Sequence, residues 1–318
     1  MKNEFYPLQF NPILKERIWG GNKLATLLHK DVITDKIGES WELSTVGNDV
    51  SIITNGSWQG KSIVECIKMF PVEILGENVH SNFGSEFPLL FKFIDATTDL
   101  SIQVHPNDEL AQKRHNSFGK TEMWYVIHAE SEARIISGFR ETSNQHSYLE
   151  NLENKTLPSI LNEIIVDEGD AFFLESGTVH AIGAGMVVAE IQQTSDITYR
   201  VYDWDRVDDK GNSRELHIDQ ALDAINYSFV DTKCHYDHKV NASNQMVNCP
   251  YFTTNIIFLS GELRYQKKAD SFTVFMIVKG KFSIDADEYA MGETILIPAA
   301  LPDFIMKGDA SILEIYIS

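Results

Sequence analysis

Polar and apolar side chains alternate in the segment Ser-Ile-Gln-Val-His, which begins at Ser101. Successive side chains of a β-strand point to opposite faces, so Ser101, Gln103 and His105 share one face and the two apolar residues share the other. A buried strand with a polar face must border a cavity or a metal ion, because buried polar groups need partners. The pattern therefore predicts a sheet whose inner face carries a site.

Most of the remaining chain also has the character of short strands. Segments rich in β-formers and bounded by glycine, serine or aspartate occupy residues 87–95, 124–128, 133–137, 171–174 and 186–192. Helical periodicity is confined to fewer places. We expect helices over residues 61–70, after a possible serine or glycine start, over 107–112, after Pro106, and over 216–225, capped by Ser213.

An internal repeat indicates the architecture. Residues 167–174 resemble residues 290–297, and in both copies an acidic residue after glycine leads into an apolar strand. A β-rich segment precedes each copy, at residues 124–127 and 275–280. This arrangement resembles the second motif of a cupin barrel. We therefore expect a mainly β protein with two cupin-type β-barrels, or jelly rolls, and a few helices.

The two copies of the repeat differ in their chemistry. His180 lies ten residues after Asp170 of the first copy, and Asp303 lies ten residues after Glu293 of the second. Glu122 falls opposite Thr273 in the same alignment. The second copy thus lacks both potential metal donors, and we expect it to be structural.

A polar stretch over residues 234–248 is the best candidate for a domain boundary. We expect residues 1–240 to form a catalytic, metal-binding cupin domain with helical additions. Residues 241–318 would form a degenerate C-terminal cupin barrel.

The charge of the chain limits its partners. The formal net charge is −19 at pH 7, from 46 acidic and 27 basic residues. This balance disfavours nucleic acids and anionic membranes as partners. It would also repel a phosphorylated substrate, so such a ligand would require a local cationic patch.

Targeting and redox features indicate the cytoplasm. Residues 1–7 contain no apolar run of signal length, and no segment approaches the ~18 apolar residues of a membrane-spanning helix. Cys66, Cys234 and Cys249 are an odd number without a CxxC spacing, which is typical of reduced thiols. We expect a cytoplasmic monomer or small homo-oligomer.

Gln103, His105, Glu122 and His180 are candidate ligands of one divalent metal ion. Two imidazoles, one carboxylate and one amide oxygen suit Zn²⁺, with Mn²⁺, Fe²⁺ and Co²⁺ as alternatives. The spacing alone fits a site without metal equally well. In that alternative His105 would begin a helix, Glu122 would be exposed to solvent and His180 would be satisfied in a turn.

Several motifs resemble those of class I mannose-6-phosphate isomerases, and they run nearly end to end. They are Arg-Ile-Trp-Gly-Gly at 17–21, Gly-Glu-Ser-Trp-Glu at 38–42, Ser-Ile-Gln-Val-His-Pro at 101–106, Lys-Thr-Glu-Met at 120–123, Val-His-Ala at 179–181 and Glu-Ile-Gln-Gln-Thr-Ser-Asp-Ile-Thr-Tyr-Arg at 190–200. The short spacing from Glu122 to His180 is similar to that of the compact bacterial branch, which lacks a large helical insertion. One departure is Ile182, where longer members often carry tyrosine.

The resemblance implies roles for named residues. Gln103, His105, Glu122 and His180 would bind one Zn²⁺ per chain, with Gln103 as the least usual donor. Arg200 would be the catalytic arginine. Lys92 lies in an otherwise apolar strand, where an unpaired ammonium is costly, so we expect it to face an anion in a cavity. Ser101, Lys92, Lys120 and Arg200 would form the cationic, hydrogen-bonding patch.

The implied reaction interconverts D-mannose 6-phosphate and D-fructose 6-phosphate through a metal-assisted cis-enediol. Glu190, Lys120 or a metal-bound water would move the proton between C2 and C1, although Glu190 would also suit a simple ion pair with a lysine. Arg200 would stabilise the enediolate or hold the phosphate. Two alternatives remain: an Fe²⁺-dependent cupin oxygenase, which needs no cationic patch, and a non-catalytic sugar-phosphate sensor, which needs no intact metal site.

Overall fold

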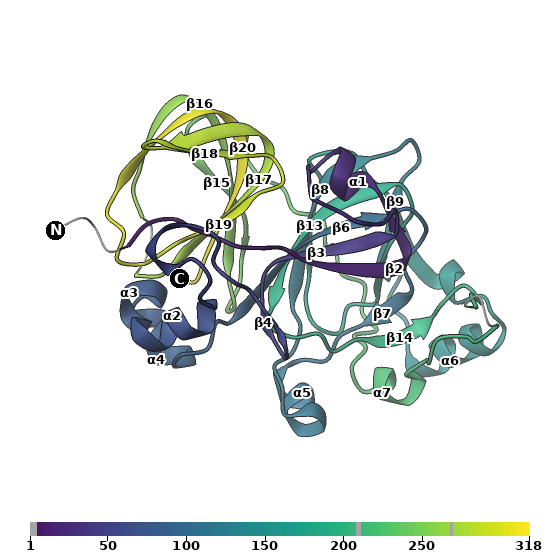
Figure 1. Cartoon of the computed structure of the whole chain (residues 1–318). Helices are drawn as coiled ribbons and strands as arrows, with labels where there is room; N and C mark the ends of the chain where they lie inside the picture. The colour runs from purple at the N-terminus through teal and green to yellow at the C-terminus, as the bar shows by residue number, and fades with distance from the viewer. Residues whose placement is uncertain (1–4, 208–210, 268–269) are drawn as a thin grey trace.

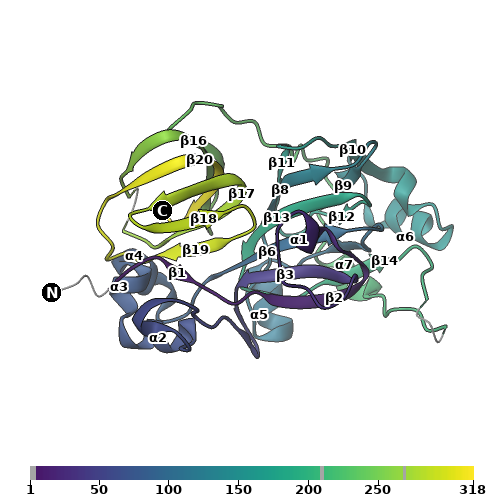
Figure 2. The same ribbon diagram turned by 45° about the horizontal axis from the view of Figure 1, so that its top comes forward.

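The computed structural model describes residues 5–207, 211–267 and 270–318. Residues 1–4 lie outside the described residues, so the expectation about a signal segment falls partly outside them as well. The chain is mainly β, and two antiparallel barrels lie side by side with a few helices around them (Figures 1 and 2). This architecture confirms the predicted fold class.

The N-terminal barrel consists of two sheets that face each other. The larger sheet has the strand order β11 (Ala171–Leu174), β8 (Glu122–Ala129), β13 (Met186–Gln193), β6 (Leu89–Ala96), β3 (Ile37–Leu43), β2 (Ile13–Gly21). The smaller sheet has the order β10 (Leu161–Ile165), β9 (Arg134–Phe139), β12 (His180–Ile182), β7 (Ile102–Val104), β14 (Tyr199–Tyr202). A short hairpin of β4 (Thr45–Val46) and β5 (Asp49–Val50) stands apart from both.

The C-terminal barrel is one curved sheet. Its strand order is β1 (Leu8–Gln9), β19 (Thr294–Ile297), β17 (Thr273–Ile284), β20 (Phe304–Tyr316), β16 (Thr253–Tyr265), β15 (Ser243–Asn248), and β18 (Asp287–Ala290) pairs with β17. The N-terminal strand β1 thus completes a sheet that is otherwise built from the last part of the chain. The division into residues 1–240 and 241–318 stays a prediction.

Helices surround the barrels at three places. The α-helices are α1 (Lys23–Thr26), α2 (Ile63–Met69), α3 (Pro71–Leu75), α4 (Glu77–Phe83), α5 (Asp108–His115), α6 (Gln145–Glu153) and α7 (Ile218–Leu222), and the 3₁₀ turns are η1 (Gly56–Trp58) and η2 (Leu157–Ile160). Helices α2 to α4 lie beneath the C-terminal barrel, whereas α6 and α7 lie at the far side of the N-terminal barrel (Figure 1). Backbone hydrogen bonds from residues 272 and 299 to Leu75 and Ile74 join α3 to the C-terminal barrel.

The predicted strands are all present, and two of the three predicted helices begin as expected. Ser62 caps α2 and accepts a hydrogen bond from the Glu65 backbone, and Asn107 caps α5. The predicted cap at Ser213 is wrong. Helix α7 begins only at Ile218, and Ser213 instead forms a β-bridge with Val207, because it lies before the turn that leads into the helix.

The predicted repeat occupies equivalent pairs of strands. In the first barrel β8 pairs with β11, and Glu122 lies opposite Leu174. In the second barrel β17 pairs with β19, and Thr273 lies opposite Ile297. The two registers match, so Thr273 holds the position of Glu122.

Apolar side chains fill the space between the two barrels. One buried cluster joins the outer face of the large N-terminal sheet to the outer face of the C-terminal sheet, and it includes Phe91, Met123, Ile191, Val274, Met276 and Leu313. A strand packed on its outer face in this way leaves its inner face free for polar groups. The interface therefore helps to define which side chains of β6, β8 and β13 point into the N-terminal barrel.

The described part of the chain contains no helix that is long and apolar enough to cross a membrane. Cys66, Cys234 and Cys249 are free thiols, in agreement with the sequence.

Candidate active site

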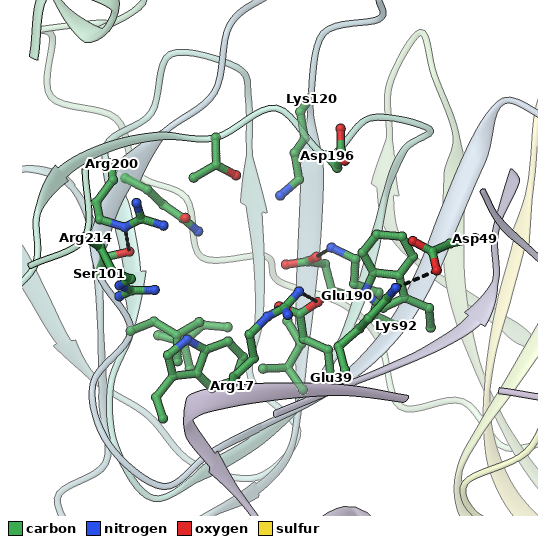
Figure 3. A pocket seen from close by; sticks show the side chains of 18 residues that line it. Arg17, Glu39, Asp49, Lys92, Ser101, Lys120, Glu190, Asp196, Arg200 and Arg214 are labelled. Carbon is green, nitrogen blue, oxygen red and sulfur yellow. Dashed lines mark hydrogen bonds and ion pairs between the residues drawn. The ribbon is translucent and has the colours of Figure 1, made fainter. Parts of the chain in front are cut away.

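A cavity of about 510 Å³ opens into the N-terminal barrel between its two sheets (Figure 3). Among the described residues that line this cavity, six are basic and four are acidic, although the whole chain carries a charge of −19. The basic residues are Lys15, Arg17, Lys92, Lys120, Arg200 and Arg214. The local cationic surplus that a phosphorylated ligand would require is therefore present at this site.

Strand β7 presents the predicted polar face to the cavity. Ser101 and Gln103 line the cavity, whereas Ile102 and Val104 are fully buried in an apolar cluster on the opposite side. The alternation read from the sequence is therefore correct.

Three predicted metal ligands converge beside this face. His105, Glu122 and His180 come from the ends of three strands, and their ligand atoms all lie within 4.8 Å of one another. His105 Nε2 lies 3.5 Å from Glu122 Oε2, and His180 Nε2 lies 3.3 Å from Glu122 Oε1. All three side chains are buried, so Glu122 is not the solvent-exposed residue of the alternative interpretation.

Hydrogen bonds orient both imidazole rings toward Glu122. His105 Nδ1 lies 2.8 Å from the Ile197 carbonyl oxygen, and His180 Nδ1 lies 2.8 Å from the Thr178 carbonyl oxygen. A carbonyl oxygen only accepts, so Nδ1 carries the proton and Nε2 presents its lone pair. Burial lowers the pKa of His105 well below its usual value and that of His180 to about 4, so both rings are neutral at pH 7.

This donor set fits a divalent cation. Both Glu122 carboxylate oxygens and His180 Nε2 are buried, and none of them has a hydrogen bond of suitable geometry within the described part of the chain. The His180 Nε2 lone pair faces Glu122 Oε1 at 3.3 Å, and this contact is repulsive unless a cation lies between the two atoms. Neutral imidazoles with their Nδ1 protons bonded to carbonyls are the usual form of metal-binding histidine.

Gln103 lies on the same face as this cluster. It is directly opposite His180 on one neighbouring strand and directly opposite Arg200 on the other. Side chains at opposite positions of paired strands are neighbours. Gln103 is therefore placed between the metal-ligand cluster and Arg200, and its role as a ligand stays a prediction.

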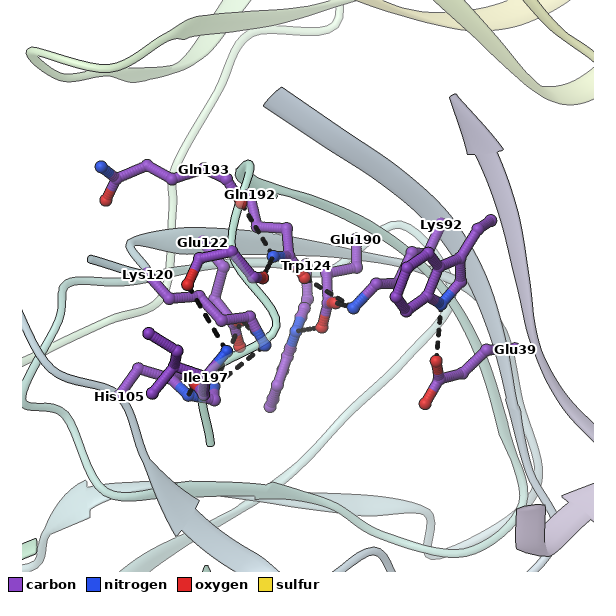
Figure 4. Close-up of polar contacts among 12 residues, drawn as sticks. Glu39, Lys92, His105, Lys120, Glu122, Trp124, Glu190, Gln192, Gln193 and Ile197 are labelled. Atoms are coloured by element: carbon purple, nitrogen blue, oxygen red, sulfur yellow. Dashed lines mark hydrogen bonds and ion pairs between the residues drawn. The ribbon is translucent and has the colours of Figure 1, made fainter. Parts of the chain in front are cut away.

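Lys92, Glu190 and Trp124 form a buried network on the opposite wall (Figure 4). Lys92 Nζ donates to Glu190 Oε1 at 2.8 Å and to Gln192 Oε1 at 2.6 Å, and Trp124 Nε1 donates to Glu190 Oε2 at 2.9 Å. Burial raises the pKa of Glu190, but the charges of Lys92 and Lys120 outweigh it and lower that pKa overall. The Lys92 ammonium thus faces the cavity, but it is already paired within the protein.

Lys120 connects this network to the metal-ligand cluster. Its Nζ lies 3.0 Å from Glu122 Oε2 and 3.1 Å from His105 Nε2. Although burial lowers the pKa of Lys120, Glu122 and Glu190 raise it overall, so the ammonium form is favoured. The loop that carries Lys120 is held by a hydrogen bond from the Gly119 backbone to Asp108.

Arg200 and Ser101 lie together at the other side of the cavity (Figure 3). Arg200 Nε donates to Ser101 Oγ at 3.3 Å, and its Nη1 donates to the Glu215 carbonyl oxygen at 2.9 Å. Arg200 forms no salt bridge with Asp203 in the described structure, and the Asp203 carboxylate binds Arg206 and Arg214 instead.

Comparisons with known proteins identify the family. Residues 8–125 match the family described as phosphomannose isomerase type I, catalytic domain. The chain is 35% identical over 316 residues to mannose-6-phosphate isomerase ManA of Bacillus subtilis, covering 96% of each chain. It is 34% identical over 312 residues to mannose-6-phosphate isomerase of Streptococcus mutans, covering 96% of this chain and 97% of the other. The chain belongs to the type I mannose-6-phosphate isomerase family.

A solved structure agrees with this assignment. The crystal structure of mannose 6-phosphate isomerase from Bacillus subtilis superimposes with a TM-score of 0.88 at 30% identity, covering 98% of this chain and 99% of that one. The resemblance inferred from the motifs is therefore confirmed. These relatives favour neither the iron oxygenase nor the sensor.

Sequence reasoning missed one wall of the cavity in this member of the mannose-6-phosphate isomerase family. Arg17 binds Glu39 through two hydrogen bonds of 2.9 and 3.1 Å, and Trp41 Nε1 donates to Glu39 at 2.7 Å. Burial raises the pKa of Glu39, but Lys92 and Arg17 lower it overall. The sequence carried one signal, because Arg17 and Trp19 alternate with Ile18 and so share one face of a strand. In the structure Ile18 is 56% exposed, whereas Arg17 and Trp19 line the cavity.

Proposed function

We propose that this protein is a zinc-dependent mannose-6-phosphate isomerase that interconverts D-mannose 6-phosphate and D-fructose 6-phosphate. The observation that carries the proposal is the buried His105–Glu122–His180 cluster beside a cationic cavity. Relatives named for this activity align with the chain over almost its full length. We further propose that the chemistry belongs to residues 1–240 and that residues 241–318 are structural.

His105, Glu122 and His180 would hold the metal, with Gln103 as a fourth donor. The set of two imidazoles, one carboxylate and one amide suits Zn²⁺, and we propose one ion per chain. When bound, the metal would polarise the sugar carbonyl and so acidify the neighbouring C–H group.

Substrate binding and proton transfer would be carried out by residues on two sides of the cavity. Arg200 and Ser101 would bind or neutralise the anionic parts of the substrate, because they present a guanidinium and a hydroxyl to the cavity. Glu190 is held as a carboxylate by Lys92 and Trp124, and it would take the proton from one carbon and return it to the next. Lys120 would donate its proton to the developing enediolate oxygen.

A coupled isomerase assay tests the proposal. Chelated protein should lose turnover of mannose 6-phosphate, and stoichiometric Zn²⁺ should restore it, with the same rate under anaerobic conditions. Fructose 6-phosphate should form without consumption of oxygen. Zinc-loaded protein that binds mannose 6-phosphate without converting it would contradict the isomerase assignment.

A further inference from the structure

Arg214 is a cavity residue that no sequence motif indicated. It lies between β14 and α7, and its side chain reaches the same side of the cavity as Arg200 and Ser101 (Figure 3). Its Nε and Nη2 donate to the two oxygens of Asp203 at 2.7 and 2.5 Å. Asp203 is only 6% exposed, so it is a fixed anchor for this guanidinium.

The anchor leaves part of Arg214 available. A guanidinium offers five N–H donors in a planar fork, and the edge made by Nε and Nη2 is used by Asp203. Arg214 donates from Nε and Nη2 and Arg200 from Nε and Nη1, so Nη1 of Arg214 and Nη2 of Arg200 have no acceptor within the described part of the chain. Two cationic groups therefore present unused donors to one side of the cavity.

The charges at this side are not balanced. Arg200, Arg206 and Arg214 lie around one buried carboxylate, Asp203, which binds Arg206 at 2.5 Å as well as Arg214, and the exposed Glu215 adds a second negative charge near Arg200. Burial and the neighbouring Arg214 charge both lower the pKa of Arg200, because two cations are held close together in a half-buried place. A dianion bound between Arg200 and Arg214 would relieve this repulsion.

We propose that Arg214 and Arg200 bind the phosphate group of the sugar-phosphate substrate from two sides, and that Asp203 positions Arg214 for this contact. This inference rests on the proposed function and extends it to a specificity-determining residue. The two guanidiniums would select dianionic phosphate esters, because a neutral sugar leaves their mutual repulsion in place. The opposite wall is less suited to phosphate, since Arg17 donates from Nε and Nη2 to Glu39 and from Nη1 to the Glu16 carbonyl oxygen, and Lys92 is paired with Glu190.

Arg206 offers a matched control. It shares Asp203 with Arg214 and donates to the Asp99 carbonyl oxygen, but it does not line the cavity. Removing Arg206 therefore perturbs the same ion-pair cluster without removing a donor from the cavity. A purely structural role of Arg214 predicts the same kinetic effect for both substitutions.

The test compares zinc-loaded wild type, R214Q and R206Q. We expect R214Q to raise both the KM for mannose 6-phosphate and the inhibition constant of inorganic phosphate by about 10- to 100-fold, the value of one or two charge-assisted hydrogen bonds. The kcat should change much less, because the contact is made in the ground state as well as in the transition state. R206Q should stay close to wild type in both constants.

R214K gives a second measurement if R214Q fails to fold. It keeps the charge but loses the fork that binds Asp203 and phosphate together, so both constants should rise by an intermediate amount. Wild-type values in R214K, or equal values in R214Q and R206Q, would overturn the proposal. Calorimetry measures phosphate binding by wild type and each variant without turnover, so it tests the role of Arg214 alone. The proposed function is tested separately, and it fails if zinc-loaded wild type does not turn over mannose 6-phosphate.

Discussion

Glu122 is the residue whose surroundings are hardest to explain without a metal ion. It is fully buried, two imidazole lone pairs face it, and burial raises its pKa to about 7. Lys120 is the cation closest to it, at 3.0 Å, but no hydrogen bond of suitable geometry forms between them in the described structure. A metal ion would satisfy the carboxylate and both histidines at once.

Replacing His180 with alanine should remove metal and isomerase activity together, since the site would keep too few donors to hold zinc at nanomolar levels. Elemental analysis and the coupled assay measure both quantities on the same sample. His128→Ala is the control, because His128 pairs with Glu168 near the surface and lies outside the cluster. Full zinc content in His180→Ala would rule out His180 as a ligand.

Glu190 and Lys92 allow a catalytic role to be separated from a structural one. Glu190→Gln should lower kcat by about 100-fold or more while zinc content is kept, because the amide cannot accept the carbon-bound proton. Lys92→Met should cost more stability than Glu190→Gln, about 3–5 kcal/mol, since it leaves a buried carboxylate without its partner. Urea unfolding and steady-state kinetics distinguish the two effects. If Glu190→Gln keeps wild-type turnover, Glu190 serves only as the ion-pair partner of Lys92.

At the scale of secondary-structure elements, side-chain alternation and helix caps in the sequence predicted the strands and helix starts that depend on neighbouring residues. The alternation at 101–105 gave both the strand and the inward face, and Ser62 marked the start of α2. Ser213 was misassigned because α7 begins without a side-chain cap, so nothing in the sequence marked its start. Arg214 was missed because its loop has no periodicity, and the pairing of Gln103 with both His180 and Arg200 depends on strands distant in sequence.

The capping box of α2 should contribute stability without affecting the site. Ser62 accepts a hydrogen bond from the Glu65 backbone, and Glu65 accepts one from the Ser62 backbone. Ser62→Ala should lower the free energy of unfolding by about 1 kcal/mol, the usual value of an N-cap, with unchanged turnover. Chemical denaturation measures the difference, and Ser62→Asp, which can still cap, should recover most of it. A loss of turnover in Ser62→Ala would mean that α2 influences the cavity.

At the scale of the whole molecule, the two barrels repeat one buried arrangement with different chemistry. In the first barrel Glu190 lies opposite Lys92 on one neighbouring strand. In the second barrel Glu314 lies opposite Asn255 on the equivalent strand. Lys92 donates to Glu190 at 2.8 Å, and Asn255 donates to Glu314 at 2.7 Å. The second barrel thus keeps the carboxylate but has a neutral amide in place of the cation.

This difference predicts opposite effects of the same substitution in the two barrels. Glu314 is fully buried, and its Oε1 has no hydrogen bond of suitable geometry in the described structure, although the Tyr265 hydroxyl interacts with this carboxylate. Glu190, in contrast, is neutralised by Lys92. Glu314→Gln keeps the shape and removes a poorly compensated charge, so it should raise the free energy of unfolding at pH 7 by roughly 1–3 kcal/mol. Glu190→Gln should lower it, because Lys92 then loses its counter-charge.

Urea unfolding of both variants measures the two signs, and the coupled assay shows whether the site is affected. Glu314→Gln should keep wild-type kcat and KM, as expected for a structural second barrel. Destabilisation by Glu314→Gln would mean that Glu314 has a cationic or protonated partner in solution, and lost turnover with unchanged stability would place the second barrel within the catalytic machinery.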